Sequence, residues 1–459
     1  MAQTPQVSIL TPCRNAADTL PATAAGVQAQ TLTDWEWLCV DDGSTDETRS
    51  LLDRLAAADS RVRVHSAHAR GAAAARNAAR RQARGHYILF LDADDTMRSD
   101  ALNVLVRAAS LAGPRTLVAA GYEFLDRDAR PLNWYHFPSV PDFTLDVLLR
   151  GNRIPMMTLI PSDGLAPQPL DEDQQACIDW DLWCRLAHEG FRCVTVPRVL
   201  FGCRLRRDSL SHRTEILFAA GRRMCAKWLP HAGRPDELDD VPYRWACACG
   251  ALALASGDPH AIVRYVEGLA PPEQTDGFVH ALAAALHHAF RFVHGTVRQT
   301  WSSHAEAWRP QIESWLRSGP LARFAGPTLA CLDAICPDPA RRFEAVREFL
   351  RGQPAVKSIL VYGLGTNGLT LLEQLRSDPT LRHFVLFVAD DRAGPLTFET
   401  LGLPRSDPRH WERWPEQTVT VVTPNRCDEM KACLDRAGGR ENNDYMVLAR
   451  AAVAVEAGT

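Results

Sequence analysis

The chain has 459 residues, of which 46% are hydrophobic and 23% charged, as expected for a globular protein of two or three domains. A formal net charge of −4 and the lack of a long basic tail argue against a nucleic-acid partner. Without a signal-like start or an apolar run near about 18 residues, the sequence predicts no transmembrane segment and at most peripheral membrane contact. Its thirteen cysteines form no CxxC pair, which indicates reduced thiols and a cytoplasmic location.

Residues 1–215 alternate strand and helix patterns. We expect strands at residues 7–12, 35–41, 61–67 and 87–91, and helices at residues 19–30, 48–58 and 72–82. Strands separated by helices predict a largely parallel sheet, so the first domain is of the α/β class.

Residues 216–353 predict a helical middle domain. They are rich in Ala, Leu, Trp and His, and Phe278, Leu282, Leu286 and Phe290 recur every four residues, as on one helix face. This segment is expected to orient the acceptor, join the flanking domains or form a homodimer contact.

Residues 354–459 return to an α/β pattern and predict a small Rossmann-like C-terminal domain. In "VYGLGTNG", Gly363, Gly365 and Gly368 have GxGxxG spacing after a strand, and Asp390 follows on the next strand. This is the context of a possible nucleotide site. The domain is too short for a complete dinucleotide fold, so a structural or interaction role is favoured over nucleotide binding and NAD chemistry.

Three aspartates follow the fourth strand in the stretch "HYILFLDADDTM". Asp92 and Asp94 are two residues apart, and in extended backbone such side chains point to one side. Carboxylates crowded at a strand end repel one another unless a cation is present. Mg²⁺ or Mn²⁺ suits oxygen ligands and can bridge phosphates. The alternative is that the aspartates only begin the following helix.

Two other strand ends are also polar. The first strand ends in "TPCRN" and the second in "VDDGSTD", which contains Asp41 and Asp42. The helix "GAAAARNAARRQARG" supplies arginines, of which Arg76 lies nearest the helix start. Ligands of open α/β sheets bind at the carboxyl ends of strands, so we expect a nucleoside diphosphate pocket there.

Four motifs then appear in order: "VSILTPCRN", "DWEWLCVDDGSTDET", "GAAAARNAARRQARGHYILFLDADD" and "IDWDLWCRLAHEG". Together they resemble the family 2 glycosyltransferases, which have the GT-A nucleotide-sugar-binding fold. The resemblance covers roughly residues 5–215. It implies a metal-dependent inverting glycosyltransferase of glycan, glycolipid or glycoprotein synthesis.

The resemblance implies roles for individual residues. The segment Thr11–Asn15, with Thr11, Pro12, Arg14 and Asn15, would line the nucleotide base and ribose. Asp42 would contact the base, with Asp41 beside it, and Arg76 would lie near the base or phosphates. Asp92, Ala93 and Asp94 match the DxD motif, in which the last aspartate usually ligates Mn²⁺ or Mg²⁺.

In the motif "ACIDWDLWCRL", the resemblance assigns the catalytic base to Asp179. Asp179 and Asp181 are about 200° apart around a helix, so they cannot both face one substrate. The alternative is that Asp179 only caps the helix. Ile178 stands where the family has glutamate, which puts the acceptor geometry in question.

The segment "FGCRLRRDSLSH" resembles the family's closing loop, in which His212 is a candidate metal or phosphate contact. The alternative is an exposed loop histidine without such a role. A UDP-sugar is the expected donor, and a glycan, a lipid-linked molecule or a protein is the expected acceptor. Two alternatives use the C-terminal domain: a nucleotide-sugar oxidoreductase or epimerase, and a non-catalytic nucleotide-sugar-binding scaffold.

Overall fold

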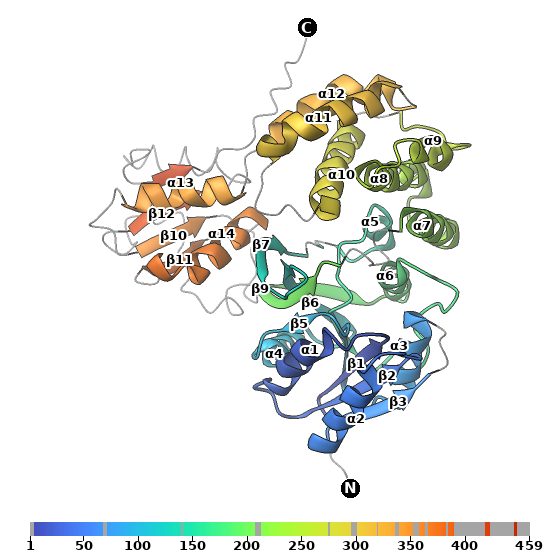
Figure 1. Ribbon diagram of the computed structural model, residues 1–459, viewed down its shortest axis with the longest axis vertical. Helices are drawn as coiled ribbons and strands as arrows, with labels where there is room; N and C mark the ends of the chain where they lie inside the picture. Colours follow the sequence, from blue (N-terminus) through green and yellow to red (C-terminus); the bar gives the residue numbers. More distant parts are fainter. Residues whose placement is uncertain are drawn as a thin grey trace. The chain divides into compact units, whose positions relative to one another are not determined.

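The structure is a computed structural model with two compact units, residues 1–273 and 274–459 (Figure 1). It describes residues 4–67, 71–138, 140, 142–206, 213–273, 276–294, 301–318, 320–335, 339–351, 358–362, 366–381, 384–389, 418–422 and 445–447. The division into domains at residues 215 and 353 stays a prediction, and each unit is described by itself.

The first unit is built on a sheet whose described strands follow the order β3-β2-β1-β4-β8-β6-β9-β5, with β7 paired to β6. The first four of these are β1 (Val7–Cys13), β2 (Trp35–Asp41), β3 (Val62–Ser66) and β4 (Tyr87–Phe90). They pair in parallel, so their carboxyl ends meet at one edge. This half of the sheet confirms the predicted strands and their parallel order.

Beyond β4 the sheet becomes mixed, which corrects the expectation of a largely parallel sheet. The strands there are β5 (Thr96–Met97), β6 (Thr116–Leu125), β7 (Pro131–His136), β8 (Leu159–Pro161) and β9 (Arg192–Arg204). Strand β6 runs parallel to β9, but β8 is antiparallel to β4, and β5 is antiparallel to β9. Pairing between short, distant strands leaves no periodic signal in the sequence.

The pairing of β5 with β9 matters for the site because it carries the chain directly after β4 across the sheet. Thr96 lies opposite Gly202. A Cβ atom on Gly202 would lie 2.5 Å from the Thr96 hydroxyl oxygen, so glycine allows this close approach. The aspartate loop, residues 92–95, is thereby fixed at both ends by strands.

Helices cover the sheet and extend the unit. They are α1 (Leu20–Gln28), α2 (Thr48–Ala58), α3 (Ala72–Gln82), α4 (Ala101–Ala112), α5 (Leu145–Leu149), α6 (Ile178–His188), α7 (Thr214–Trp228), α8 (Val241–Ala255) and α9 (Ala261–Val266). Helix α3 packs on β1 and β2, α4 on β6, and α5 on α6 (Figure 1). The bounds of α2 and α3 are those predicted from the sequence.

A buried carboxylate on β2, that of Glu36, connects this strand to its neighbours β1 and β3. Glu36 is 2% exposed and accepts hydrogen bonds from Ser8, Arg63 and Arg84. Burial alone would raise its pKa, but the Ser8 and Arg84 hydrogen bonds outweigh burial and leave the pKa lowered. Glu36 therefore stabilises the fold above its unfolded-state pKa and loses this contribution as the pH falls through its folded-state pKa.

The second unit contains α10 (Asp276–His294), α11 (Trp301–Ser318), α12 (Ala325–Ile335), α13 (Pro339–Arg351) and α14 (Thr366–Ser377). Its strands are β10 (Ser358–Tyr362), β11 (Val385–Ala389), β12 (Thr418–Val422) and β13 (Tyr445–Val447). They form a parallel sheet in the order β11-β10-β12-β13. Phe278, Leu282, Leu286 and Phe290 are all buried on α10, as their spacing predicts.

Among the helices that the structure describes, none combines the length and the apolar character needed to cross a bilayer.

Candidate active site

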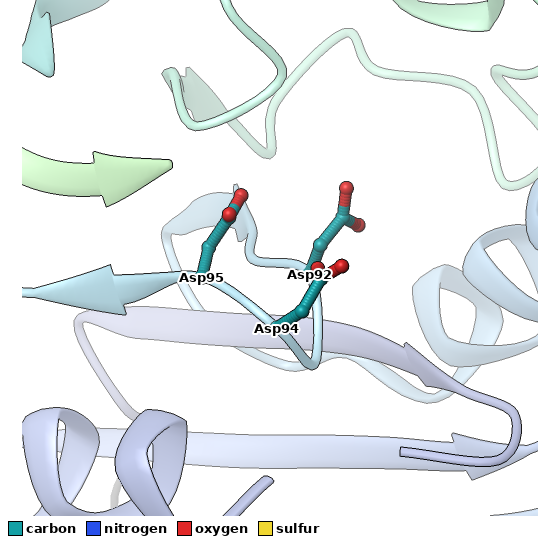
Figure 2. Close-up of side chains that lie close together, drawn as sticks. All are labelled: Asp92, Asp94 and Asp95. Carbon is teal, nitrogen blue, oxygen red and sulfur yellow. The ribbon is translucent and has the colours of Figure 1, made fainter. Parts of the chain in front are cut away.

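Three carboxylates gather on the loop between β4 and β5. Figure 2 shows Asp92, Asp94 and Asp95 pointing to the same side of this loop. One oxygen from each lies within 4.8 Å of the others, and no other such group of His, Cys, Asp or Glu ligands occurs among the described residues. The predicted pair of aspartates is therefore part of a triad at the carboxyl end of β4.

Crowding perturbs these carboxylates. Burial and the neighbouring Asp92 raise the pKa of Asp94 from 3.8 to about 6, against the opposing effects of Arg206 and Arg204. Burial and the two neighbouring aspartates raise the pKa of Asp95 well above its usual range. The loop thus concentrates negative charge that a cation would relieve.

Two arginines hold the loop in place. The buried Arg76 of α3 forms an ion pair with Asp92, which engages one oxygen of that carboxylate. Arg204, at the end of β9, donates from its main-chain N to Asp95 Oδ1 at 3.1 Å and from Nε to the Asp94 carbonyl at 3.0 Å. Among the three aspartates, Asp95 is buried at 6% exposure, while Asp92 and Asp94 are partly exposed. Asp94 is thus the member best placed to meet a ligand.

The loops after β1 and β2 are joined to each other beside the triad. Asn15 has a positive φ of 48°, and its Oδ1 accepts a 2.8 Å hydrogen bond from the Thr45 main-chain N. Its own main-chain N donates to Ser44 Oγ at 3.0 Å. Arg14 is exposed and Pro12 partly exposed in the same loop. These contacts bring together the two polar strand ends that the sequence predicts to form a pocket.

The remaining predicted donor residues are held by local contacts. Thr11 is fully buried, and its hydroxyl accepts a hydrogen bond from Trp37 Nε1 at 2.8 Å.

The two aspartates at the end of β2 are held by main-chain N–H groups. Asp42 is buried and accepts from the Gly71 main-chain N at 2.9 Å, while Asp41 accepts from the Ser44 main-chain N at 3.1 Å. The carbonyl of Ala93 accepts from Thr19 and Thr23. The predicted roles of these residues at a nucleotide stay predictions.

Asp179 lies in the first turn of α6 and is partly buried. Its Oδ1 accepts from the Trp180 main-chain N at 2.9 Å, and its Oδ2 accepts from Asn152 Nδ2 at 2.7 Å. Burial raises the pKa of Asp179, while Asn152, Trp180 and the nearby Arg76 act in the opposite direction. Arg76 therefore lies within electrostatic reach of both Asp92 and Asp179.

Asn152 is a site residue that the sequence argument missed. It lies 27 residues before Asp179, on the segment between α5 and β8, and no local pattern predicts their contact. The only sequence signal is indirect, since Ile178 leaves the position before Asp179 without a polar side chain.

Asp181 has a different environment, as the helix geometry predicts. It is 2% exposed and accepts from Trp228 Nε1 at 2.6 Å and from Lys227 Nζ at 2.9 Å. Both partners are on α7, so Asp181 fastens α6 to that helix. Of the two aspartates of the motif, Asp181 is structural, and the role of Asp179 as a base stays a prediction.

We expect Asp181→Ala to lower the free energy of unfolding by about 2–3 kcal/mol, because it leaves a buried indole N–H and an ammonium group without their acceptor. Lys227 is 32% exposed and can turn to water, which limits the loss. Urea denaturation followed by tryptophan fluorescence measures the change. Asp173→Ala is the matched control, since Asp173 is 82% exposed at the outer edge of the same cluster. An equal loss in both variants would contradict a structural role for Asp181.

Several predicted residues cannot be placed. His212 lies outside the described residues, as do Gly363, Gly365 and Asp390. Gly368 lies within α14. The proposed metal contact of His212 and the possible C-terminal nucleotide site stay predictions.

The fold and the site define a class of protein: an α/β protein with a cluster of carboxylate oxygens at the carboxyl end of a parallel strand and a partly buried aspartate at the start of helix α6. Residues 8–154 match the model of glycosyl transferase family 2. TuaG of Bacillus subtilis, a glycosyltransferase assigned to teichuronic acid biosynthesis, is 31% identical over 217 residues, which are 45% of this chain and 82% of TuaG. The chain belongs to glycosyl transferase family 2 and is a glycosyltransferase.

A second relative is the Escherichia coli enzyme WfgD, named as a UDP-Glc:alpha-D-GlcNAc-diphosphoundecaprenol beta-1,3-glucosyltransferase. It is 36% identical over 124 residues, which are 27% of this chain and about half (48%) of WfgD. The relatives are glycosyltransferases, which favours this activity over an oxidoreductase, an epimerase or a non-catalytic scaffold.

Solved structures are less similar. Staphylococcus aureus TarS in complex with UDP-GlcNAc has a TM-score of 0.42 at 14% identity, covering 72% of this chain and 91% of the TarS chain. The Pyrobaculum calidifontis mannosyltransferase PcManGT in complex with GDP-Man and Mn²⁺ has a TM-score of 0.37 at 16% identity, covering 72% and 88%. Similarity at this level carries no argument about the site.

Proposed function

We propose that the protein is an inverting glycosyltransferase that moves a sugar from a UDP-sugar to a hydroxyl group of a growing glycan or lipid-linked glycan. The observation that carries this proposal is the carboxylate triad at the end of β4, linked through Arg76 to a separate, partly buried Asp179. The triad can hold a cation that binds the donor diphosphate, and the Asp179 carboxylate can take a proton from the acceptor hydroxyl.

The triad fits a hard divalent cation. Its ligand atoms are carboxylate oxygens within 4.8 Å of one another, and burial together with the neighbouring charge of Asp92 raises the pKa of Asp94. We assign Asp94 as the direct ligand of Mn²⁺ or Mg²⁺, because one oxygen of Asp92 is engaged by Arg76. Bound there, the cation would supply charge stabilisation to the diphosphate leaving group.

Other residues of the chain would bind the nucleoside and the phosphates and would accept the proton. The loops after β1 and β2 would bind the nucleoside, and Arg76 would stay near the phosphates through its ion pair with Asp92. Asp179 would accept the proton of the acceptor hydroxyl while the hydroxyl oxygen bonds to the anomeric carbon. The bond from that carbon to the phosphate oxygen breaks, and its electron pair leaves with the nucleoside diphosphate. A single displacement without a carboxylate nucleophile inverts the anomeric carbon.

The names of the relatives support the donor and acceptor classes. WfgD is named for UDP-Glc and for a lipid-linked diphosphate acceptor, and TuaG for teichuronic acid biosynthesis. A UDP-sugar and a bacterial polysaccharide precursor are therefore the first substrates to test.

The test is a donor-hydrolysis screen of the full chain with UDP-, GDP- and dTDP-sugars, with Mn²⁺, with Mg²⁺ or with EDTA. We expect slow release of UDP from a UDP-sugar that needs the divalent cation, and recovery when excess Mn²⁺ follows EDTA. Release that is indifferent to EDTA would remove the metal assignment. No release from any sugar nucleotide under any condition, with or without polysaccharide precursors as acceptors, would overturn the proposed reaction.

A further inference from the structure

The carboxylate of Asp179 is held from outside its own helix by one side chain. Asn152 Nδ2 donates to Asp179 Oδ2 at 2.7 Å, and the Asn152 side chain is itself exposed. Among the described residues, the other hydrogen bond from a neighbour to this carboxylate, from the Trp180 main-chain N to Oδ1, belongs to the helix start. Without Asn152, the orientation of Asp179 about its side-chain bonds would rest on one contact from the adjacent residue.

The segment that carries Asn152 is anchored by α6 itself. Trp180 Nε1 donates to the Leu148 carbonyl at 2.7 Å, before Asn152, and Trp183 Nε1 donates to the Ile154 carbonyl at 2.9 Å, after it. Both indoles are buried at 2% exposure or less. The two tryptophans of the "DWDLW" motif therefore fix the backbone on both sides of Asn152.

The chemistry of this contact suits a general base. An amide N–H donated to a carboxylate favours the ionised form, which is the form that accepts a proton. Each carboxylate oxygen has two lone pairs, so Oδ2 can still accept the acceptor hydroxyl. In addition, the amide does not titrate and stays a hydrogen-bond donor over the whole working pH range. A glutamate side chain would lose its donor when its carboxyl group ionises.

We propose that Asn152 is a positioning residue for Asp179: its amide sets the orientation of the catalytic carboxylate and favours the form that accepts a proton. This inference rests on the proposed role of Asp179 as the base. It extends that role to a residue that no motif of the sequence contains.

The other groups that act on Asp179 come from three elements. Arg76 on α3 stabilises the carboxylate. Tyr122 on β6 and Cys177 at the start of α6 also lie within electrostatic reach, and burial raises the pKa of both, so they stay neutral near pH 7. Among the described residues, Arg76 and Asn152 are therefore side chains that favour the ionised form, and Asn152 bonds directly to the carboxylate.

The test uses two substitutions at Asn152 in the full chain, with UDP release from UDP-glucose or UDP-GlcNAc measured between pH 5 and 9. Asn152→Ala removes the donor, and we expect turnover to fall about tenfold. Asn152→Asp keeps the shape but places a like charge against Asp179, so we expect the acid limb of the pH profile to move upward by about one pH unit or more. Binding of UDP with Mn²⁺, measured by calorimetry, should be unchanged in both variants.

Asn103→Asp is the matched control, because Asn103 is exposed on α4 and the substitution makes the same chemical change there. If the acid limb of Asn152→Asp coincides with that of the wild type and of this control, the positioning role is wrong. Failure of the proposed function gives a different result: Asp179→Asn would then retain turnover, whatever the Asn152 variants do. Loss of UDP binding in both Asn152 variants would show a structural role instead and would also overturn the inference.

Discussion

Replacing Asp179 with asparagine is expected to reduce transfer by about a thousandfold while leaving donor binding intact. General base catalysis typically contributes about 10²–10⁴-fold, and the amide cannot accept the acceptor proton. The substitution keeps the size of the side chain, and the Oδ1 position can still accept from the Trp180 main-chain N. Measurement of kcat for UDP release, together with the Kd for UDP and Mn²⁺, separates chemistry from binding.

The same residue predicts the pH dependence of the reaction. Burial raises the pKa of Asp179 above its ordinary value of 3.8, so protonation removes the base at a higher pH than for an exposed aspartate. We therefore expect kcat to increase with pH through an acid limb that lies higher than that of an exposed aspartate and then to level off, with the limb absent from the residual activity of Asp179→Asn.

The control for Asp179→Asn is Asp163→Asn, an equal change at an exposed aspartate. Wild-type turnover in the control, combined with the loss in Asp179→Asn, would assign the effect to the site. Wild-type turnover in Asp179→Asn would rule out Asp179 as the base and would leave the family assignment unaffected.

Replacing Asp94 with alanine is expected to weaken Mn²⁺ binding and to lower kcat/KM at least about a hundredfold, because charge on the departing diphosphate would lose its main stabilising group. Asp179→Asn is expected to lose turnover and keep UDP binding, whereas Asp94→Ala is expected to lose the metal-dependent part of UDP binding. Titration of Mn²⁺ in the presence of UDP, followed by the electron paramagnetic resonance signal of free Mn²⁺, measures it directly.

Asp92→Asn is the informative companion to Asp94→Ala. Asp92 forms an ion pair with Arg76, whereas we assign the direct metal contact to Asp94. We expect Asp92→Asn to retain more of the Mn²⁺ affinity than Asp94→Ala. If the two substitutions weaken Mn²⁺ binding equally, both carboxylates are ligands; if neither weakens it, the metal lies elsewhere.

The local features of the site follow from the sequence alone. The aspartates after β4 are neighbours in the chain, and the alternating patterns before them predict the parallel strands whose ends carry polar residues. The separation of Asp179 from Asp181 also follows, because helical geometry turns two positions apart by about 200°. These predictions succeed because each depends on residues within one or two turns or on a regular repeat.

The contacts that complete the site depend on the tertiary structure. Arg76 pairs with Asp92, Arg204 fixes the aspartate loop from β9, and Asn152 reaches Asp179 from another segment. The antiparallel strands β5 and β8 likewise pair with distant partners. Such contacts join residues from 16 to 109 positions apart, and no propensity or period in the chain encodes them. The sequence by itself determined which chemical groups this glycosyltransferase has at its strand ends, and only the packing of distant segments decided which of them are held, charged and turned toward one another.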